Sequence, residues 1–239
     1  MDKKYSDVGN TILNVLDKAT NFTDWMYSHI KPHLKGTILE VGSGSGTYSK
    51  KIIEDFKNHS IILSDVDELY EKSLKEKFSS DRVQVLKLDL EKKEDFEALS
   101  NKVDSAFALN VFEHIEHDEE ALINIYANMN SGGTLILLVP AHQFLYNRID
   151  ESVNHFRRYS KKMLIAKIAG TEFILEKYYY FNFFSIFGWY WNGNILKKSE
   201  LDEGLLSIFD FFVPVFSFIE KYILRGTCGI SLIAILKKP

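Results

Sequence analysis

The stretch Glu40–Gly46, with the sequence EVGSGSG, constrains the fold of this chain more than any other feature. It follows residues 37–41, an apolar run that predicts a strand, and it precedes residues 48–56, which have the spacing of an amphipathic helix. Glycine permits a sharp turn and lets the backbone approach a ligand without a Cβ in the way. A strand, a glycine turn and a helix in this order indicate a nucleotide-type cofactor site at the carboxyl end of a strand in an open α/β sheet.

The middle of the chain alternates short apolar runs with helical patterns, which predicts βαβ units and a mostly parallel sheet. We predict further strands at 60–64, 82–88, 103–109, 134–139, 172–180 and 229–236. We predict further helices at 69–78, 94–100, 119–129 and 160–169, the third of them stopping before Gly132 and Gly133. Ser160 is the expected N-cap of the last helix, because its hydroxyl can accept from the free N–H groups of the first turn.

The 239 residues fit one α/β domain, which we divide into four parts. These are an N-terminal helical cap (1–36), a cofactor-binding core (37–180), an aromatic insertion (181–226) and a closing strand (227–239). Residues 178–222 hold 16 of the 33 aromatic residues. This insertion is open to four interpretations: a substrate lid that covers an apolar acceptor, a membrane contact, a dimer face, or helices that pack on the sheet edge. Asn182, Trp189 and Asn192 could face a ligand there.

Composition excludes several classes of protein. The net charge of −4 gives no reason to expect a basic face that would bind nucleic acid. The single cysteine, Cys228, allows no intrachain disulfide, so we expect a cytoplasmic protein. The N-terminus lacks an apolar signal core. The longest apolar stretch, 205–219, has about 15 residues where a spanning helix needs roughly 20, so we predict no transmembrane segment, and peripheral membrane contact stays open. Glu113 and His117 are four residues apart but have no obvious third ligand, so we predict no metal site.

Two carboxylates follow the next two predicted strands. Asp65 lies 19 positions after Gly46, where an acceptor-only carboxylate can bind both ribose hydroxyls, and Asp89 follows the third strand, where it can accept from an adenine amino group. Each acid could also simply cap a helix. Thr47 stands where the dinucleotide fingerprint places its third glycine, so the loop is one residue short for a pyrophosphate cradle. The three strand ends together favour an adenosyl site.

With these features, residues 37–140 resemble the class I S-adenosylmethionine-dependent methyltransferases. The matching pieces, in the order and spacing of that family, are ILEVGSGSG at 38–46, LSDVD at 63–67, LDL at 88–90, ALNVFEHI at 108–115 and GGTLILLVP at 132–140. The resemblance implies S-adenosylmethionine as cofactor and S-adenosylhomocysteine as product. It also implies a Rossmann-like, mostly parallel sheet of seven strands with an antiparallel last strand, helices on both faces, and the aromatic helical insertion between the last two strands.

The resemblance further implies roles for individual residues. Glu40 and the turn would hold the methionine end, Asp65 the ribose, Val66 the adenine face, Asp89 and Leu90 the adenine edge, and Asn110 and Val111 the floor near the sulfonium. The cofactor-binding set is therefore Glu40, Gly42, Ser43, Gly44, Gly46, Asp65, Val66, Asp89, Leu90, Asn110 and Val111.

A methyl acceptor that arrives protonated needs a base, and histidine titrates near neutrality. We name His114 and His155 as candidate catalytic residues. His117 is better explained as a solvated helix start.

The segment after the fifth predicted strand is similar to one in a bacterial methyltransferase subgroup, some members of which accompany glycosyltransferases for polysaccharides or lipid-linked sugars. The candidate acceptor-binding residues are His142, Tyr146, Asp150, Arg157, Arg158, Tyr159 and Trp189.

Alternatives remain open at this point. Asp150, His155 and Arg158 could form a buried polar lock, and the two arginines would suit a phosphate or carboxylate. The leading hypothesis is methyl transfer to a small-molecule or lipid- or sugar-linked acceptor, by a chain that could also form a homodimer. A nicotinamide or nucleotide-sugar enzyme is the second, although Tyr159 is followed at the interval of a Tyr-x-x-x-Lys dyad by Met163. A catalytically silent adenosyl-binding scaffold is the third.

Overall fold

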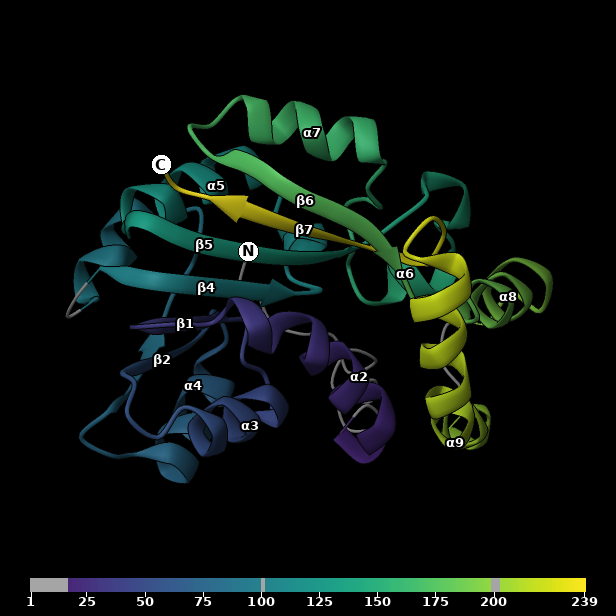
Figure 1. Ribbon diagram of the computed structural model, residues 1–239, viewed down its shortest axis with the longest axis horizontal. Coiled ribbons are helices and arrows are strands. Elements are labelled where there is room, and N and C mark those ends of the chain that lie inside the picture. The colour runs from purple at the N-terminus through teal and green to yellow at the C-terminus, as the bar shows by residue number, and fades with distance from the viewer. Residues whose placement is uncertain (1–16, 100–101, 199–202) are drawn as a thin grey trace.

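The computed structural model describes residues 17–99, 102–198 and 203–239, and it contains a seven-stranded sheet (Figure 1). The strand order is β3-β2-β1-β4-β5-β7-β6. The strands are β1 (Ile38–Val41), β2 (Ile61–Asp65), β3 (Val83–Lys87), β4 (Val103–Leu109), β5 (Met129–Pro140), β6 (Ile174–Phe181) and β7 (Ser231–Lys237). The pairs among β1 to β5 are parallel, whereas β7 runs antiparallel to both of its neighbours. The predicted fold class is confirmed.

Helices cover both faces of this sheet, and each face has its own apolar core. On one face, α5 (Asp118–Ala127) and α7 (Lys161–Ala169) bury Leu122, Ile125 and Leu164 against the strands. On the other face, α2 (Thr20–Ile30), α3 (Thr47–Asp55) and α4 (Glu68–Phe78) bury side chains such as Ile52 and Leu74. Because β1, β2 and the central part of β5 are buried on both faces, their sequences are mostly apolar and do not alternate between apolar and polar residues.

Two helix starts explain how the local sequence defines these elements. Ser160 caps α7 as predicted, its Oγ accepting from Met163 N at 3.1 Å. Asp67 caps α4 by accepting from Leu69 N at 2.8 Å. Since Asp67 satisfies the start of α4, the neighbouring Asp65 does not cap this helix and is left to bond the glycine turn.

The structure differs from the sequence prediction in several elements, one of which is a short helix that was not predicted, α6 (Arg148–Ser152). Residues Lys93–Ala98 form a 3-10 helix rather than an α-helix. Strand β5 begins at Met129, five residues earlier than predicted, because Met129 pairs with Val103 across a register shift. Gly132, with a φ of 74°, therefore lies inside an irregular strand and not in a helix stop.

The aromatic insertion between β6 and β7 is helical, as predicted. It consists of α8 (Ser185–Trp189), the π-helix η5 (Tyr190–Ile195), α9 (Glu203–Ile219) and the π-helix η6 (Glu220–Leu224). These helices stand at one end of the sheet, beyond the carboxyl ends of the parallel strands (Figure 1). Asp210 on α9 accepts from Phe22 N of α2 at 2.7 Å, which ties the insertion to the N-terminal cap. Within the described ranges, the helices are too short or too polar to cross a bilayer.

Candidate active site

The glycine turn after β1 has a backbone that other residues would strain. Gly42, Gly44 and Gly46 have φ angles of 69°, 52° and 90°. A Cβ at Gly42 would lie 2.5 Å from Val111 Cγ2, and one at Gly46 would lie 2.6 Å from Phe78 Cε2. The turn therefore needs glycine for its conformation and for the close approach of neighbouring elements. Gly46 is also the N-cap residue of α3.

Asp65 at the end of β2 is bonded directly to this turn. One carboxylate oxygen accepts from Gly44 N at 2.9 Å, and the other accepts from Asp67 N at 2.9 Å. Burial raises the pKa of Asp65 to about 6, although the backbone donors oppose the shift. Leu88 N donates to the Asp65 carbonyl at 3.0 Å, so the end of β3 and Asp89 lie next to Asp65. The structure thus brings together the three strand ends that the sequence singled out.

Glu40, the third residue of β1, is a buried carboxyl group whose exposed fraction is only 2%. Ser49 on α3 donates to its Oε2 at 2.5 Å. Burial raises the pKa of Glu40 to about 8, because the hydrogen bonds from Ser49 and Ser43 offset only part of the desolvation. Ser49 was not among the predicted site residues, since nothing in the sequence indicates that a serine nine positions away reaches this carboxylate.

A cavity of about 450 Å³ extends from the glycine turn to the aromatic insertion. The turn, Glu40 and Asn110 form one side, and α2 contributes apolar side chains that the sequence analysis did not identify. The far side is formed by the predicted residues His114, His155, Arg158 and Trp189, together with Asn182 and Asn192. Leu205, Leu206 and Phe209 of α9 also contact it, so the insertion is a wall of the cavity.

Six predicted cofactor residues are not among those that line the cavity: Gly46, Asp65, Val66, Asp89, Leu90 and Val111. Val66, Asp89 and Leu90 follow β2 and β3, where Asp89 Oδ1 accepts from Glu91 N at 3.2 Å. Val111 packs behind the turn against Gly42. Val111 itself follows β4, and the cofactor contacts of all six residues remain expectations of the resemblance.

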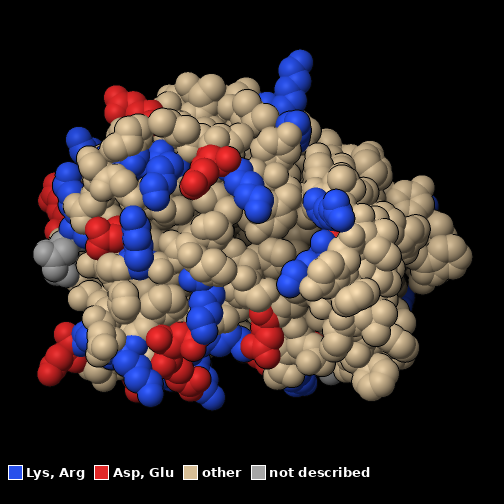
Figure 2. All heavy atoms as spheres, in the orientation of Figure 1, with Lys and Arg blue, Asp and Glu red and all other residues tan. Residues whose placement is uncertain are grey.

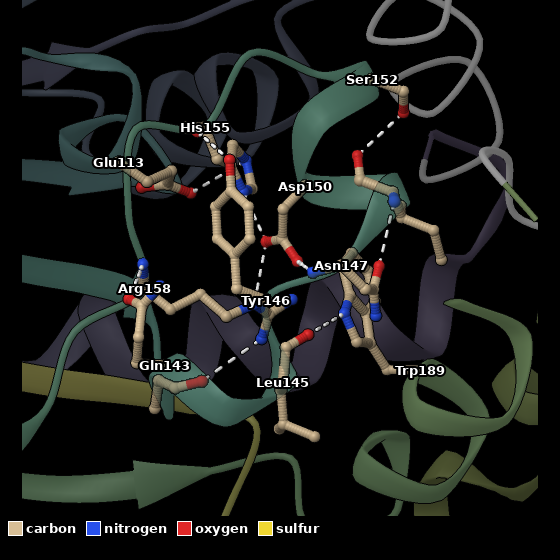
Figure 3. A network of polar contacts seen from close by, with 12 residues as sticks. Glu113, Gln143, Leu145, Tyr146, Asn147, Asp150, Ser152, His155, Arg158 and Trp189 are labelled. Carbon is tan, nitrogen blue, oxygen red and sulfur yellow. Dashed lines mark hydrogen bonds and ion pairs between the residues drawn. The ribbon is translucent and has the colours of Figure 1, made fainter. Parts of the chain in front are cut away.

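A polar network holds His155 at the cavity wall (Figure 3). His155 Nδ1 lies 2.8 Å from Asp150 Oδ1, and Arg158 Nε donates to the same oxygen at 2.8 Å. Asp150 and Arg158 are buried, and the Arg158 guanidinium stacks over the Trp189 ring at 4.4 Å. Asp150 is ionised, because hydrogen bonds from His155 and Arg158 and the charge of Arg158 hold its pKa below the ordinary value despite burial. The network leaves His155 Nε2 directed away from Asp150.

Glu113 and His114 complete this wall. Both Glu113 carboxyl oxygens are buried and lack a hydrogen-bond partner among the described residues, and burial raises the pKa of Glu113 to about 8. His155 Nε2 lies 3.8 Å from Glu113 Oε1 (Figure 3). Burial lowers the pKa of His114 to about 3, and its ring lies 4.6 Å from that of His155. Atoms of the three residues that could bind a cation lie within 4.8 Å of one another, a cluster that the sequence analysis did not identify.

The other predicted acceptor residues make contacts within the protein and are absent from the cavity lining. His142 Nε2 lies 3.0 Å from the Gly229 carbonyl. Tyr146 donates to the His155 carbonyl at 2.7 Å. Arg157 pairs with Asp118 at 3.1 Å, and Tyr159 donates to the same carboxylate at 2.6 Å. These side chains hold the segment after β5 in place, and they leave His155, Arg158 and Trp189 to face the cavity.

Comparisons with known proteins agree with this geometry. A family model described as a methyltransferase domain matches residues 39–135. Among curated proteins no sequence matches the chain. A Haloferax volcanii protein provisionally assigned as a methyltransferase, solved with a methyltransferase activator, is 14% identical, with 94% of each chain covered and a TM-score of 0.62.

Two further structures are similar over most of both chains. A provisionally assigned methyltransferase from Bacillus halodurans C-125 is 18% identical and has a TM-score of 0.58, with 91% of this chain and 99% of that one covered. A SAM dependent methyltransferase from Archaeoglobus fulgidus is 17% identical and has a TM-score of 0.59, with 92% and 94% covered. At these identities the likeness shows the fold. The chain therefore contains a region, residues 39–135, that matches a methyltransferase domain, and it has the fold of these solved methyltransferase structures.

Proposed function

We propose that the protein transfers the methyl group of S-adenosylmethionine to a protonated hydroxyl or amine of a small-molecule or lipid- or sugar-linked acceptor. One observation carries the proposal: a glycine turn bonded to Asp65 opens into a cavity whose opposite wall is His155, oriented by Asp150. The turn and the carboxylate suit an adenosyl ligand, and the histidine suits an acceptor that must lose a proton.

The donor set at the turn fits S-adenosylmethionine. Glu40 presents a carboxyl group to the cavity, which can pair with the ammonium of the methionine end when ionised. Each Asp65 oxygen already accepts one backbone N–H and keeps a lone pair for a ribose hydroxyl. Asp89, Leu90 and Val66 border the adenine side in this assignment, and Asn110 lies near the reacting methyl group.

The bound cofactor supplies an activated methyl group, and the protein must position a nucleophile and remove its proton. In the transfer, the carbon–sulfur bond breaks, a bond from the acceptor oxygen or nitrogen to that carbon forms, and S-adenosylhomocysteine leaves as a neutral thioether. Asp150 accepts the Nδ1–H of neutral His155, so the lone pair on Nε2 takes the proton from the acceptor. Burial lowers the pKa of His155 more than Asp150 raises it, so the ring is neutral at pH 7.

The rest of the cavity indicates how an acceptor would be held. Arg158 is committed to Asp150 and Trp189, so we assign it to positioning of His155 rather than to direct binding. His114, which is neutral and packed against His155, supports the same ring. Asn182 and Asn192 offer amides, while α9 presents leucine and phenylalanine side chains. An acceptor with a polar reacting end and an apolar body fits these walls.

The first test is ligand binding. S-adenosylhomocysteine at 100 times its dissociation constant should stabilise the protein by roughly 2.7 kcal/mol, whereas NAD should not stabilise it. Asp65→Asn should weaken binding about tenfold or more, because it removes a charged hydrogen-bond acceptor. Asp104→Asn is the matched control, since that acid accepts from Thr37 N at 2.8 Å, where β1 begins and away from the turn. Stabilisation by NAD alone would establish the nicotinamide hypothesis instead.

The second test separates an enzyme from a silent scaffold. His155→Asn keeps an N–H for Asp150 but has no equivalent of the Nε2 lone pair. With radiolabelled S-adenosylmethionine and defined hydroxylated acceptors, this variant should lose about 10²–10⁴-fold in transfer rate while it still binds S-adenosylhomocysteine. An unchanged rate in the variant would remove His155 from the chemistry. No transfer by the wild-type protein to either lipid-linked or water-soluble acceptors would favour the scaffold.

A further inference from the structure

Helix α9 and its continuation η6 carry two apolar stripes on opposite sides. The inner stripe, which includes Leu206, Phe209 and the buried Val213, faces the cavity and α2. The outer stripe repeats every three or four residues and is largely exposed; it consists of Ile208, Phe211, Phe212, Val215, Phe218, Tyr222 and Ile223. A helix that is apolar all round is normally buried, so the outer stripe needs a covering surface.

The other arm of the insertion adds to this surface. On α8 and η5 and just after them, the exposed apolar side chains are Phe187, Tyr190, Trp191, Ile195 and Leu196. Figure 2 shows that the end of the molecule over α8 and α9 is almost free of charged groups, whereas acidic and basic side chains crowd the opposite end. We call the outer stripe and these five residues together the apolar tip.

Beside the apolar tip, basic side chains are exposed, whereas the acidic side chains of Asp210 and Glu220 face the protein. Two acids of α9 and η6 are turned toward the protein: Asp210 accepts from Phe22 N at 2.7 Å, and Glu220 accepts from Asn182 N at 2.9 Å. The cations Lys197, Lys221 and Arg225 are exposed. An outward surface with large apolar side chains and exposed basic side chains is complementary to an anionic lipid surface.

We propose that the apolar tip docks in the interface of an anionic lipid bilayer. Helix α9 would lie along the membrane surface with its outer stripe among the headgroups and upper acyl chains, and Trp191 and Tyr222 would sit at headgroup depth, where such side chains are enriched. The inner stripe of the same helix lines the cavity. A lipid-linked acceptor could therefore pass along α9 from the bilayer to the methyl group. This acceptor class rests on the proposed function, whereas the docking does not.

Vesicle flotation without cofactor or acceptor tests the docking. The full chain should float with vesicles of phosphatidylcholine and phosphatidylglycerol, and less with phosphatidylcholine alone or in high salt, since screening weakens the basic contribution. Phe211→Asp with Phe218→Asp should reduce partitioning about tenfold or more. These side chains are 74% and 60% exposed, so their loss leaves the core intact. The matched control is Ile123→Asp with Ile174→Asp, residues 50% and 57% exposed on α5 and β6.

Several outcomes would overturn the docking. If the wild-type protein does not float with either vesicle, or the control pair loses as much binding as the tip pair, the proposal is wrong. If wild-type protein is instead dimeric by sedimentation and the tip pair makes it monomeric, a second copy of the chain covers the tip. Because S-adenosylhomocysteine binding is measured separately for each variant, a failure of docking is distinguishable from a failure of the methyltransferase site.

Discussion

Glu40 should couple cofactor binding to pH. The pKa of this carboxyl group is raised to about 8 in the free protein, and we expect it to ionise when it pairs with the ammonium of the ligand. For a pKa near 8, about 1% of the group is ionised at pH 6 and about 50% at pH 8. The affinity for S-adenosylhomocysteine should therefore rise about fiftyfold between these values, with a further factor of about 2 from Asp65, whose pKa is raised to about 6.

Isothermal titration calorimetry at pH 6, 7 and 8 measures this dependence. In buffers of different ionisation enthalpy at pH 7, binding should release about 0.9 proton, the fraction of Glu40 that must deprotonate. Glu40→Gln keeps the size of the side chain and its hydrogen bond to Ser49 but has no proton to lose. The variant should bind more weakly at pH 8, and its affinity should change only about twofold over the range, as Asp65 alone requires. A wild-type affinity that is constant from pH 6 to 8, or a variant that is equally steep, would refute the reasoning.

Two further predictions concern stability. Tyr159→Phe removes hydrogen bonds to Asp118 Oδ2 (2.6 Å) and to the Phe112 carbonyl (3.0 Å). The free energy of unfolding in urea should therefore fall by about 1–3 kcal/mol, while the affinity for the cofactor stays the same. A larger loss of affinity than of stability would place Tyr159 in the site. Burial raises the pKa of Glu113 from 4.5 to about 8, so the folded protein keeps the proton on this carboxyl group over a pH range in which the unfolded chain loses it. The stability of the wild-type protein should therefore decline, relative to that of Glu113→Gln, as the pH rises from 4.5 to 8. A stability difference between the two proteins that does not change with pH in thermal unfolding would contradict this.

The sequence was sufficient for features that depend on local pattern. Buried parallel strands are apolar runs, and the turn after the first of them is defined by three glycines, so the sheet and the place of the turn followed from periodicity and spacing. Asp65 could be placed near the turn because neighbouring parallel strands bring their carboxyl ends to one edge. The cap at Ser160 was predictable for the same reason, since its partner is only three residues away.

Features that depend on tertiary pairing were not accessible in this way. The early start of β5 follows from the pairing of Met129 with Val103, which no local pattern indicates. The sequence also left open whether the segment after β5 binds an acceptor or forms a polar lock. The structure contains the polar lock, because Asp150 and Arg158 are buried in one network, and it places His155 of that network at the cavity, where contact with an acceptor stays a prediction. Glu113 was considered only as a metal ligand, because its burial without a partner has no signature in the sequence.

The two sides of the cavity depend on different parts of the chain, and this division has a consequence for specificity. The side that would bind the cofactor and remove a proton is built on strand ends and on a segment fixed by the pairing of Ala141 with Tyr159. In the proposed site the acceptor side is built by the insertion, which contacts the core through Asp210, bonded to Phe22 N, and through Trp189, stacked on Arg158. We therefore expect changes on α9 that spare Asp210, and so leave Trp189 in place, to alter the acceptor without disturbing the chemistry. Since one helix both lines the cavity and carries the apolar tip, the insertion would select the acceptor and determine the surface from which it is taken.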